Sequence, residues 1–177
     1  KTDFLVVADF EIEEGVLHRT GLATALYIDS FIEPALQSIG ADGDITETGV
    51  ETLDRLLSNS GLAEQFIAFK IWDTTGRVIY STNSDSVGEV FDIKGELASA
   101  LNGEVSAQVT DLTDEENRIE RQVVDRSIEV YTPVHELGSG RVIAVAEFYQ
   151  RVAGLDAEIY VLRWRSWLVF GAAAGVM

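Results

Sequence analysis

The pattern of hydrophobic and polar positions predicts a helical beginning, a β-rich middle and a helical end. Between Asp3 and Ile39, apolar residues recur every three or four positions, which is typical of one apolar stripe along a helix. The stripe consists of Leu22, Leu26, Ile28, Ile32, Leu36 and Ile39. Pro34 is expected to kink this long helix near its end. Two arrangements remain open: the whole helix packs on a sheet, or its first half projects towards a membrane or a partner subunit.

A second, short helix and five strands follow. Residues 46–58 have helical spacing and end at a stop signal, Asn59-Ser-Gly61. Strands are predicted at residues 66–72, 77–81, 105–112, 127–134 and 141–149, with a helix at 94–101. Asp73-Thr-Thr-Gly76 is a tight turn that makes the first two strands a hairpin. Together they predict an α+β fold, a five-stranded antiparallel sheet preceded by a long helix.

The last two strands have two different faces. One face is almost wholly apolar and should pack against the long helix; it carries Ile128, Val130, Thr132, Val134, Val142, Ala144, Ala146 and Phe148. The other face is mixed and includes Glu129, Tyr131, Glu147 and Tyr149. A mixed face suits either solvent or a ligand pocket.

The C-terminal end changes character. Acidic residues stop at Glu158, and Leu168–Met177 is an uninterrupted apolar run preceded by Trp164 and Trp167. Indole rings favour the headgroup level of a membrane, but ten residues are half of the roughly 20 that a spanning helix needs. We therefore expect a helix from residue 151 that leads into a transmembrane segment; the alternative is a helix tail packed on the domain. The first residue is Lys1 and not Met, so we expect the chain to be part of a longer protein.

Composition excludes several functions. The net charge of −17 repels phosphate and makes nucleic acid an unsuitable partner. The chain has no Cys, and its two histidines, His18 and His135, are far apart, so we expect no metal site. No phosphate loop or nucleophile motif is present, so we expect no cofactor, no catalytic residue and no enzymatic activity in this segment. The acidic stretch at 111–120 is interpreted as a solvated loop, or alternatively as a weak divalent-cation sensor.

Several segments resemble one family. Ile71-Trp-Asp-Thr-Thr-Gly-Arg-Val-Ile-Tyr-Ser81 and Val87-Gly-Glu-Val-Phe91 resemble the first strands of bacterial extracytoplasmic single-Cache sensor domains, and Leu97-Ala-Ser-Ala-Leu-Asn-Gly-Glu104 is similar to their helix and turn. Glu129-Val-Tyr-Thr-Pro-Val134 and residues 140–150 are similar to their last two strands. The resemblance covers about residues 62–150 and implies the PAS-like architecture of the PhoQ, DcuS and CitA sensor domains.

The resemblance also implies an organisation and a site. It divides the chain into an N-terminal helical region (1–61), a sensor core (62–150) and an exit helix with the start of a transmembrane segment (151–177). In such sensors the ligand lies on a sheet face covered by the segment after the second strand, here residues 82–103. Six residues are the resulting candidates for ligand contact: Lys70, Tyr80, Arg126, Tyr131, Glu147 and Tyr149. Arg126 would clamp a carboxylate, and Lys70 and Tyr80 join the others if the first hairpin has a three-residue turn.

The function implied is signal sensing outside the cytoplasmic membrane, in the periplasm. The domain would belong to a membrane receptor, first of all a homodimeric sensor histidine kinase, with a small-molecule ligand of unknown identity. A diguanylate cyclase or chemoreceptor output is the first alternative. A soluble acidic binding or adaptor protein is the second, and an extracytoplasmic hydrolase has no residue set to support it.

Overall fold

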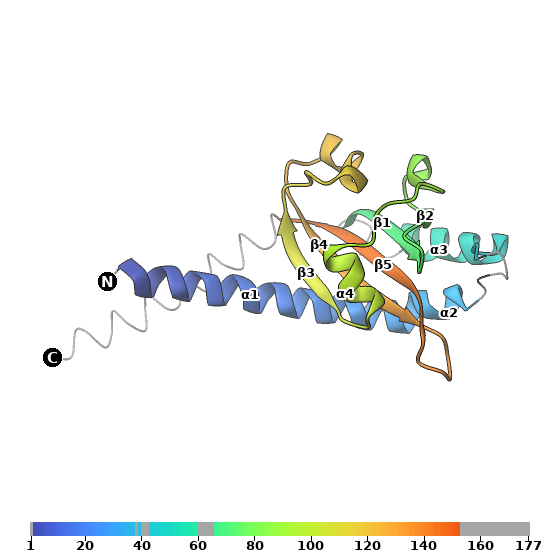
Figure 1. The fold of residues 1–177 in the computed structure, drawn as a ribbon, viewed down its shortest axis with the longest axis horizontal. Coiled ribbons are helices and arrows are strands. Elements are labelled where there is room, and N and C mark those ends of the chain that lie inside the picture. Colours follow the sequence, from blue (N-terminus) through green and yellow to red (C-terminus); the bar gives the residue numbers. More distant parts are fainter. Residues whose placement is uncertain (1, 38, 40–42, 60–65, 153–177) are drawn as a thin grey trace.

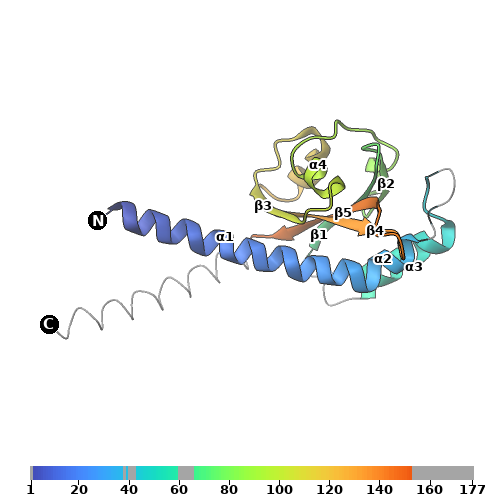
Figure 2. The ribbon, with the colours of Figure 1, turned by 60° about the horizontal axis from the view of Figure 1, so that its bottom comes forward.

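Three layers make up the fold (Figures 1 and 2). The computed structural model describes residues 2–37, 39, 43–59 and 66–152. Helices on one face of the sheet are α1 (Thr2–Tyr27), a π-helical turn at Ile28–Ile32, α2 (Glu33–Leu36) and α3 (Glu47–Asn59). The sheet follows as β1 (Phe66–Asp73), β2 (Val78–Ser81), β3 (Ser106–Thr110), β4 (Ser127–His135) and β5 (Val142–Arg151). The other face is covered by α4 (Gly95–Leu101) and by a loop with two 3-10 turns, at Glu115–Asn117 and Glu120–Gln122.

The sheet is antiparallel with strand order β2-β1-β5-β4-β3, which confirms the predicted fold class. Its first hairpin turns as expected: Asp73 accepts hydrogen bonds from the backbone N–H groups of Thr75 and Arg77, at 2.8 and 3.1 Å. Gly76 has a φ of 86°, and a Cβ there would lie 2.5 Å from the Phe91 carbonyl oxygen. Only glycine fits this turn without moving backbone.

The apolar stripe of α1 differs from the predicted one. Leu22 and Leu26 are 53% and 67% exposed, so their assignment to the buried stripe was wrong. Ile28, Ile32 and Leu36 are buried as predicted, and the positions buried before them are Val16, Gly21 and Thr24. Small residues pack here because α1 crosses close to β3: a Cβ on Gly21 would be 3.3 Å from the Ala107 Cβ.

The π-helical turn keeps that stripe on the sheet. Buried positions spaced four apart drift by about 40° per step around an ordinary α-helix. The π turn at Ile28–Ile32 is wound more loosely, so it restores the alignment of the later buried residues. Pro34 follows in the first turn of α2, where its missing N–H is tolerated.

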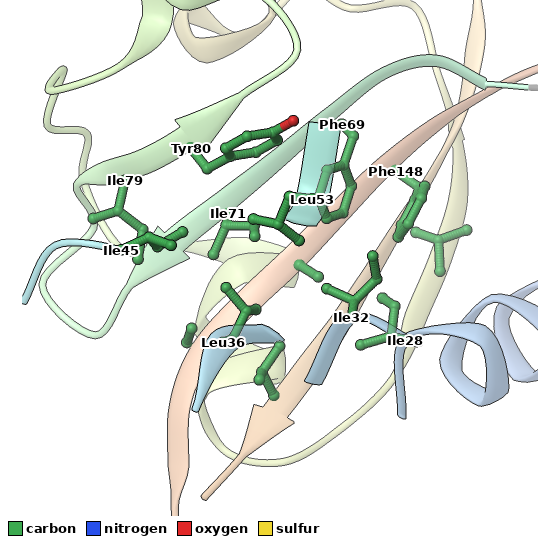
Figure 3. Packing of buried hydrophobic residues seen from close by; sticks show 14 of the residues in the cluster. Ile28, Ile32, Leu36, Ile45, Leu53, Phe69, Ile71, Ile79, Tyr80 and Phe148 are labelled. Carbon is green, nitrogen blue, oxygen red and sulfur yellow. The ribbon is translucent and has the colours of Figure 1, made fainter. Parts of the chain in front are cut away.

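The main core lies between the helices and the sheet (Figure 3). Ile28, Ile32 and Leu36 meet Leu53 of α3 and Phe148 of β5, all with no exposed surface. The apolar face predicted for β4 and β5 forms this core: Ile128, Val130, Val134, Ala144, Ala146 and Phe148 all belong to it. The prediction that this face packs under the long helix is confirmed.

Two expectations concern the chain ends. The predicted exit helix and the apolar run at 168–177 lie outside the described residues, apart from Arg151, which ends β5, and Val152, which is in a turn. Among the helices in the described part of the chain, none has the length and apolar character needed to cross a membrane.

Candidate functional site

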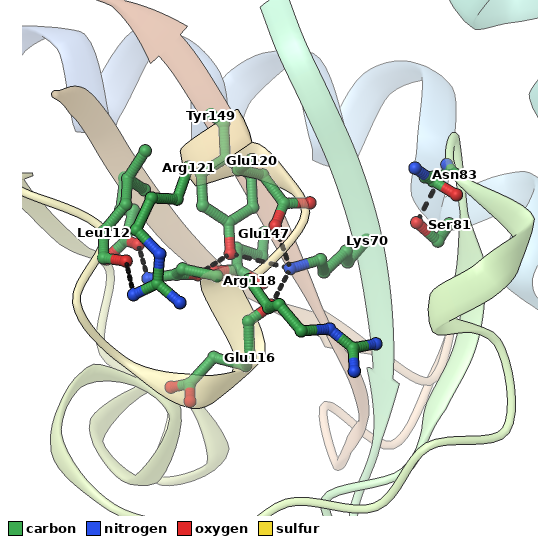
Figure 4. Close-up of polar contacts among 12 residues, drawn as sticks. Lys70, Ser81, Asn83, Leu112, Glu116, Arg118, Glu120, Arg121, Glu147 and Tyr149 are labelled. Atoms are coloured by element: carbon green, nitrogen blue, oxygen red, sulfur yellow. Dashed lines mark hydrogen bonds and ion pairs between the residues drawn. The ribbon is translucent and has the colours of Figure 1, made fainter. Parts of the chain in front are cut away.

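The second face of the sheet holds a row of polar side chains under its cover (Figure 4). Lys70 of β1 pairs with Glu147 of β5, and Glu147 pairs with Tyr131 of β4. One step along, Tyr149 pairs with Glu129. Because residues two apart share a face, these five side chains all point away from the helices. We call them, together with Trp72, Gln108, Asn117 and Glu120, the polar cluster.

Lys70 lies at the centre of the polar cluster with no exposed surface. Its Nζ donates to the Glu116 carbonyl oxygen at 2.7 Å and to the Tyr149 hydroxyl at 3.0 Å. It also pairs with Glu120 Oε2 at 3.1 Å and lies 4.7 Å from the centroid of the Tyr149 ring. The ammonium is therefore held between the sheet and the covering loop, which we define as residues 111–124.

The other two carboxylates have neutral donors. Trp72 Nε1 donates to Glu147 Oε2 at 2.8 Å. Glu129 accepts from Asn117 Nδ2 at 2.6 Å and, more weakly, from Gln108 Nε2 at 3.3 Å. The hydroxyl of Tyr149 donates in turn to Asn117 Oδ1. The covering loop is thus bonded to three strands through Asn117 and through Lys70.

The charges of the polar cluster do not balance. Three glutamates and one lysine, each at most 2% exposed, would carry a formal charge of −2. Uncompensated charge is costly in a protein interior, so the carboxyl groups of Glu129 and Glu147 retain protons more strongly than usual. Burial, and then the charge of Glu147, raises the pKa of Glu129 to about 8. Burial also raises the pKa of Glu147, against the opposing influence of Lys70.

The two tyrosines of the polar cluster respond in the same direction. Burial, reinforced by the nearby Glu147, raises the pKa of both Tyr131 and Tyr149 well above the usual value. Both phenols therefore remain neutral donors at physiological pH. Among the described residues, no group of three His, Asp or Glu side chains is arranged to hold a metal ion.

The structure brings together four of the six candidate residues, namely Lys70, Tyr131, Glu147 and Tyr149. Tyr80 is on the opposite face, because a bulge in the hairpin pairs Ile71 with Tyr80 but Trp72 with Val78. Its hydroxyl donates to Asp54 Oδ1 of α3 at 2.7 Å. Burial and then this carboxylate raise the pKa of Tyr80.

Arg126 is also outside the polar cluster. It is exposed and precedes β4, which begins at Ser127. The structure therefore places neither Arg126 nor Tyr80 beside the other four candidates.

The acidic stretch at 111–120 is only partly a solvated loop, and for Glu120 that interpretation was wrong. Glu120 is 2% exposed and Asn117 is 1% exposed, because both close over Lys70 and Tyr149. Leu112 anchors the loop; it is fully buried, at a φ of 58°, against Ala68 and Tyr149. An apolar residue inside an acidic stretch was the available signal for a packed loop.

Two segments cover this face of the sheet: α4, which lies in the segment expected from the sequence, and the covering loop, which was not expected to do so. Within the expected segment 82–103, α4 packs Leu97 and Ala100 against Trp72, Tyr131 and Val145. The polar cluster itself is closed by the covering loop. Beside Glu120, a groove of about 340 Å³ opens between that loop and the residues after β2.

Comparison with known proteins identifies the fold. No protein-family model and no curated protein matches the chain. Among solved structures, the sensor domain of the V. cholerae histidine kinase DctB aligns with a TM-score of 0.51 and 12% identity, over 90% of this chain and 61% of that one. The chain has the sensor-domain fold. The ligand-binding domain of the Pseudomonas aeruginosa amino acid chemoreceptor PctC, in complex with GABA, has the same TM-score at 14% identity, over 93% of this chain and 67% of that one.

The likeness concerns the fold, and it confirms the Cache-type architecture that the sequence resemblance implied. The chain spans less than two thirds of the DctB sensor domain. In this fold the polar cluster lies on the sheet face opposite the main core, and therefore opposite the long helix.

Proposed function

We propose that this chain is the extracytoplasmic signal-sensing domain of a transmembrane receptor, and that the signal acts on the polar cluster. The proposal rests on the charge imbalance of the polar cluster. Three buried glutamates share one lysine beneath the covering loop, and these residues also bond that loop to the sheet. Such an arrangement is costly for stability alone, and strongly perturbed ionisable groups gather at functional sites. The sensor-domain fold supports the same function.

A path from the polar cluster to α1 runs through β3. Gln108 bonds to Glu129 on the covered face, and its neighbour Ala107 packs closely against Gly21 on the helix face. A second contact joins Gln150, next to Tyr149, to Thr24: Gln150 Nε2 donates to Thr24 Oγ1 at 2.9 Å. A change in the polar cluster would therefore be transmitted to α1.

The helix displacement would be the output. A ligand shifts such an equilibrium only by its difference in affinity for the two states. The chain would act as a homodimer, with α1 and the C-terminal segment leading to the membrane. Leu22, Leu26 and Phe31 give the helices an exposed apolar surface for such pairing.

The receptor would be a sensor histidine kinase in the first instance. The similarity to the PctC domain keeps a chemoreceptor as the second candidate. This segment would contribute sensing, and any phosphotransfer would belong to another part of the receptor.

A thermal-shift screen tests the proposal. The panel contains acidic, basic and neutral metabolites and divalent cations, and the proteins are the wild type, Glu147→Gln and the exposed-site control Glu115→Gln. We expect at least one compound to raise the Tm of the wild type and the control, with the shift lost in Glu147→Gln. A panel without any hit, or hits that persist equally in Glu147→Gln, would overturn the assignment of sensing to the polar cluster.

A further inference from the structure

Glu120 connects the polar cluster with the groove of about 340 Å³. Its Oε2 is 3.1 Å from Lys70 Nζ, whereas Oε1 has no hydrogen-bond partner among the described residues. The side chain is about 1% exposed. A carboxylate oxygen this deeply buried is costly when no donor reaches it, so the site lacks a donor.

The groove has the shape and lining for a short chain. Its volume is at the small end of the range for ligand sites. Ile67 and Ala68 of β1 and Ile119 and Val123 of the covering loop supply apolar walls, and the hydroxyl and amide groups of residues 82–84 form a polar rim. Figure 4 shows Glu120 and Asn83 on either side of β1.

We infer that the groove binds a small primary amine with a short apolar tail, its ammonium group directed at Glu120. This inference rests on the proposed sensing function and names the ligand class. An ammonium group has three N–H donors, one of which can bond to Glu120 Oε1. It also brings one positive charge to the polar cluster, whose formal charge is −2. An anionic ligand would be repelled by Glu120, Glu129 and Glu147, because Lys70 is the single cation that offsets their charge within the polar cluster.

Lys70 shows that the polar cluster already accommodates an alkylammonium. Its Nζ has two oxygen acceptors, a carboxylate and the face of an aromatic ring around it. Such cation–aromatic contacts favour ammonium groups over neutral ligands. Of these groups, the Glu120 carboxylate also lines the groove, so it is the one available to a second cation arriving there.

Binding of a cation should be linked to release of a proton. The ionisable groups that face one another here come from three strands and the covering loop: Lys70, Glu129, Tyr131, Glu147, Tyr149, Glu116 and Glu120. Protons offset the excess negative charge when no ligand is present. An added positive charge displaces one of them, so affinity rises with pH until the carboxylates are ionised without help.

The test uses the purified 177-residue chain and three matched probes: n-butylammonium chloride, sodium butyrate and 1-butanol. We expect butylammonium alone to raise the Tm, by about 3–6 °C when present at about ten times its Kd. Its affinity should be up to about 30-fold higher at pH 8 than at pH 6.5, because one proton is exchanged over 1.5 pH units. Glu120→Gln should abolish the shift and Glu115→Gln should retain it.

A second variant guards against a folding defect in Glu120→Gln. Val123 is 64% exposed at the wall of the groove, so Val123→Trp should fold normally and block access. We expect it to lose the butylammonium response. A full response in either variant, an equal response to butyrate, or no response to butylammonium would overturn the amine assignment. The sensing proposal itself would survive if another compound gave a shift that depends on Glu147.

Discussion

Replacing Glu129 with Gln should change how the stability of the domain depends on pH. Glu129 is 2% exposed, and burial together with Glu147 raises its pKa from 4.5 to about 8. Below about pH 4.5 both folded and unfolded chains carry this proton, so stability is fully present. As pH rises, the unfolded chain ionises first, and stability is lost progressively until the folded carboxyl also ionises near pH 8.

The size of this effect follows from the pKa difference. Each pKa unit corresponds to about 1.4 kcal/mol, so ionising Glu129 costs the folded state roughly 5 kcal/mol between pH 4.5 and 8. Part of that cost is shared with Glu147 because the two carboxylates repel each other. Gln keeps the side-chain shape and does not ionise. The difference in unfolding free energy between Glu129→Gln and wild type should therefore rise by several kcal/mol across this range, in favour of the variant.

Urea denaturation followed by tryptophan fluorescence at pH 5, 6, 7 and 8 measures this difference. The control is Glu115→Gln, an exposed neighbour on the covering loop, whose curve should stay parallel to wild type. A constant difference between Glu129→Gln and wild type at all four pH values would refute the reasoning, because it would show that Glu129 ionises normally in the folded state.

Three further changes test the packing of the fold by denaturation. Lys70→Met removes the cation and should lower the free energy of unfolding by about 3–5 kcal/mol at pH 7, because it leaves buried carboxylates unpaired. Adding Glu120→Gln should recover part of this loss. If the effects of the two substitutions simply added, the pairing of Lys70 with Glu120 would be contradicted. Leu53→Ala should lower the free energy of unfolding by about 2–5 kcal/mol because it leaves a cavity in the core, whereas Leu22→Ala, at an exposed position, should lower it by less than about 0.5 kcal/mol. Equal losses would show that the core has been assigned wrongly. Gly76→Ala should cost about 2 kcal/mol through the positive φ and a clash with backbone, and a neutral result would contradict the turn geometry.

The strands and the two sheet faces could be predicted because each strand carries its own alternation. Polar Glu147 and apolar Phe148 are adjacent, so the face of each is determined locally. The candidate residues on β4 and β5, namely Tyr131, Glu147 and Tyr149, were accordingly assigned to the sheet face on which they lie.

Tyr80 shows the limit of this reasoning. One extra residue in a bulge moves every following side chain to the other face, and the alternation of a four-residue strand does not reveal the bulge. Leu22 and Leu26 were wrongly assigned to the buried stripe because packing with the sheet decides which face of α1 is buried. Its buried face uses Gly21 and Thr24 because the helix passes close to the sheet, whereas hydrophobicity alone favours Leu22 and Leu26.

The covering loop depends on contacts between distant parts of the chain. Glu120 is buried where its carboxylate pairs with Lys70 of β1, at 3.1 Å. Local composition indicates a solvated acidic loop, and only the antiparallel arrangement of β1, β5 and β4 brings the lysine beneath it. Asn117 and Glu120, the residues that the covering loop adds to the polar cluster, were therefore not predicted from local sequence.

Disulfide cross-linking along α1 tests the central claim most directly, namely that the polar cluster controls α1, the helix that we propose leads to the membrane. Leu22→Cys and Leu26→Cys are introduced separately into the full-length protein, in wild-type, Glu147→Gln and Glu115→Gln backgrounds. We expect Glu147→Gln to change the ratio of cross-linking at the two positions and Glu115→Gln to leave it as in wild type. The same ratio in all three backgrounds, or no cross-linking at either position, would contradict the account.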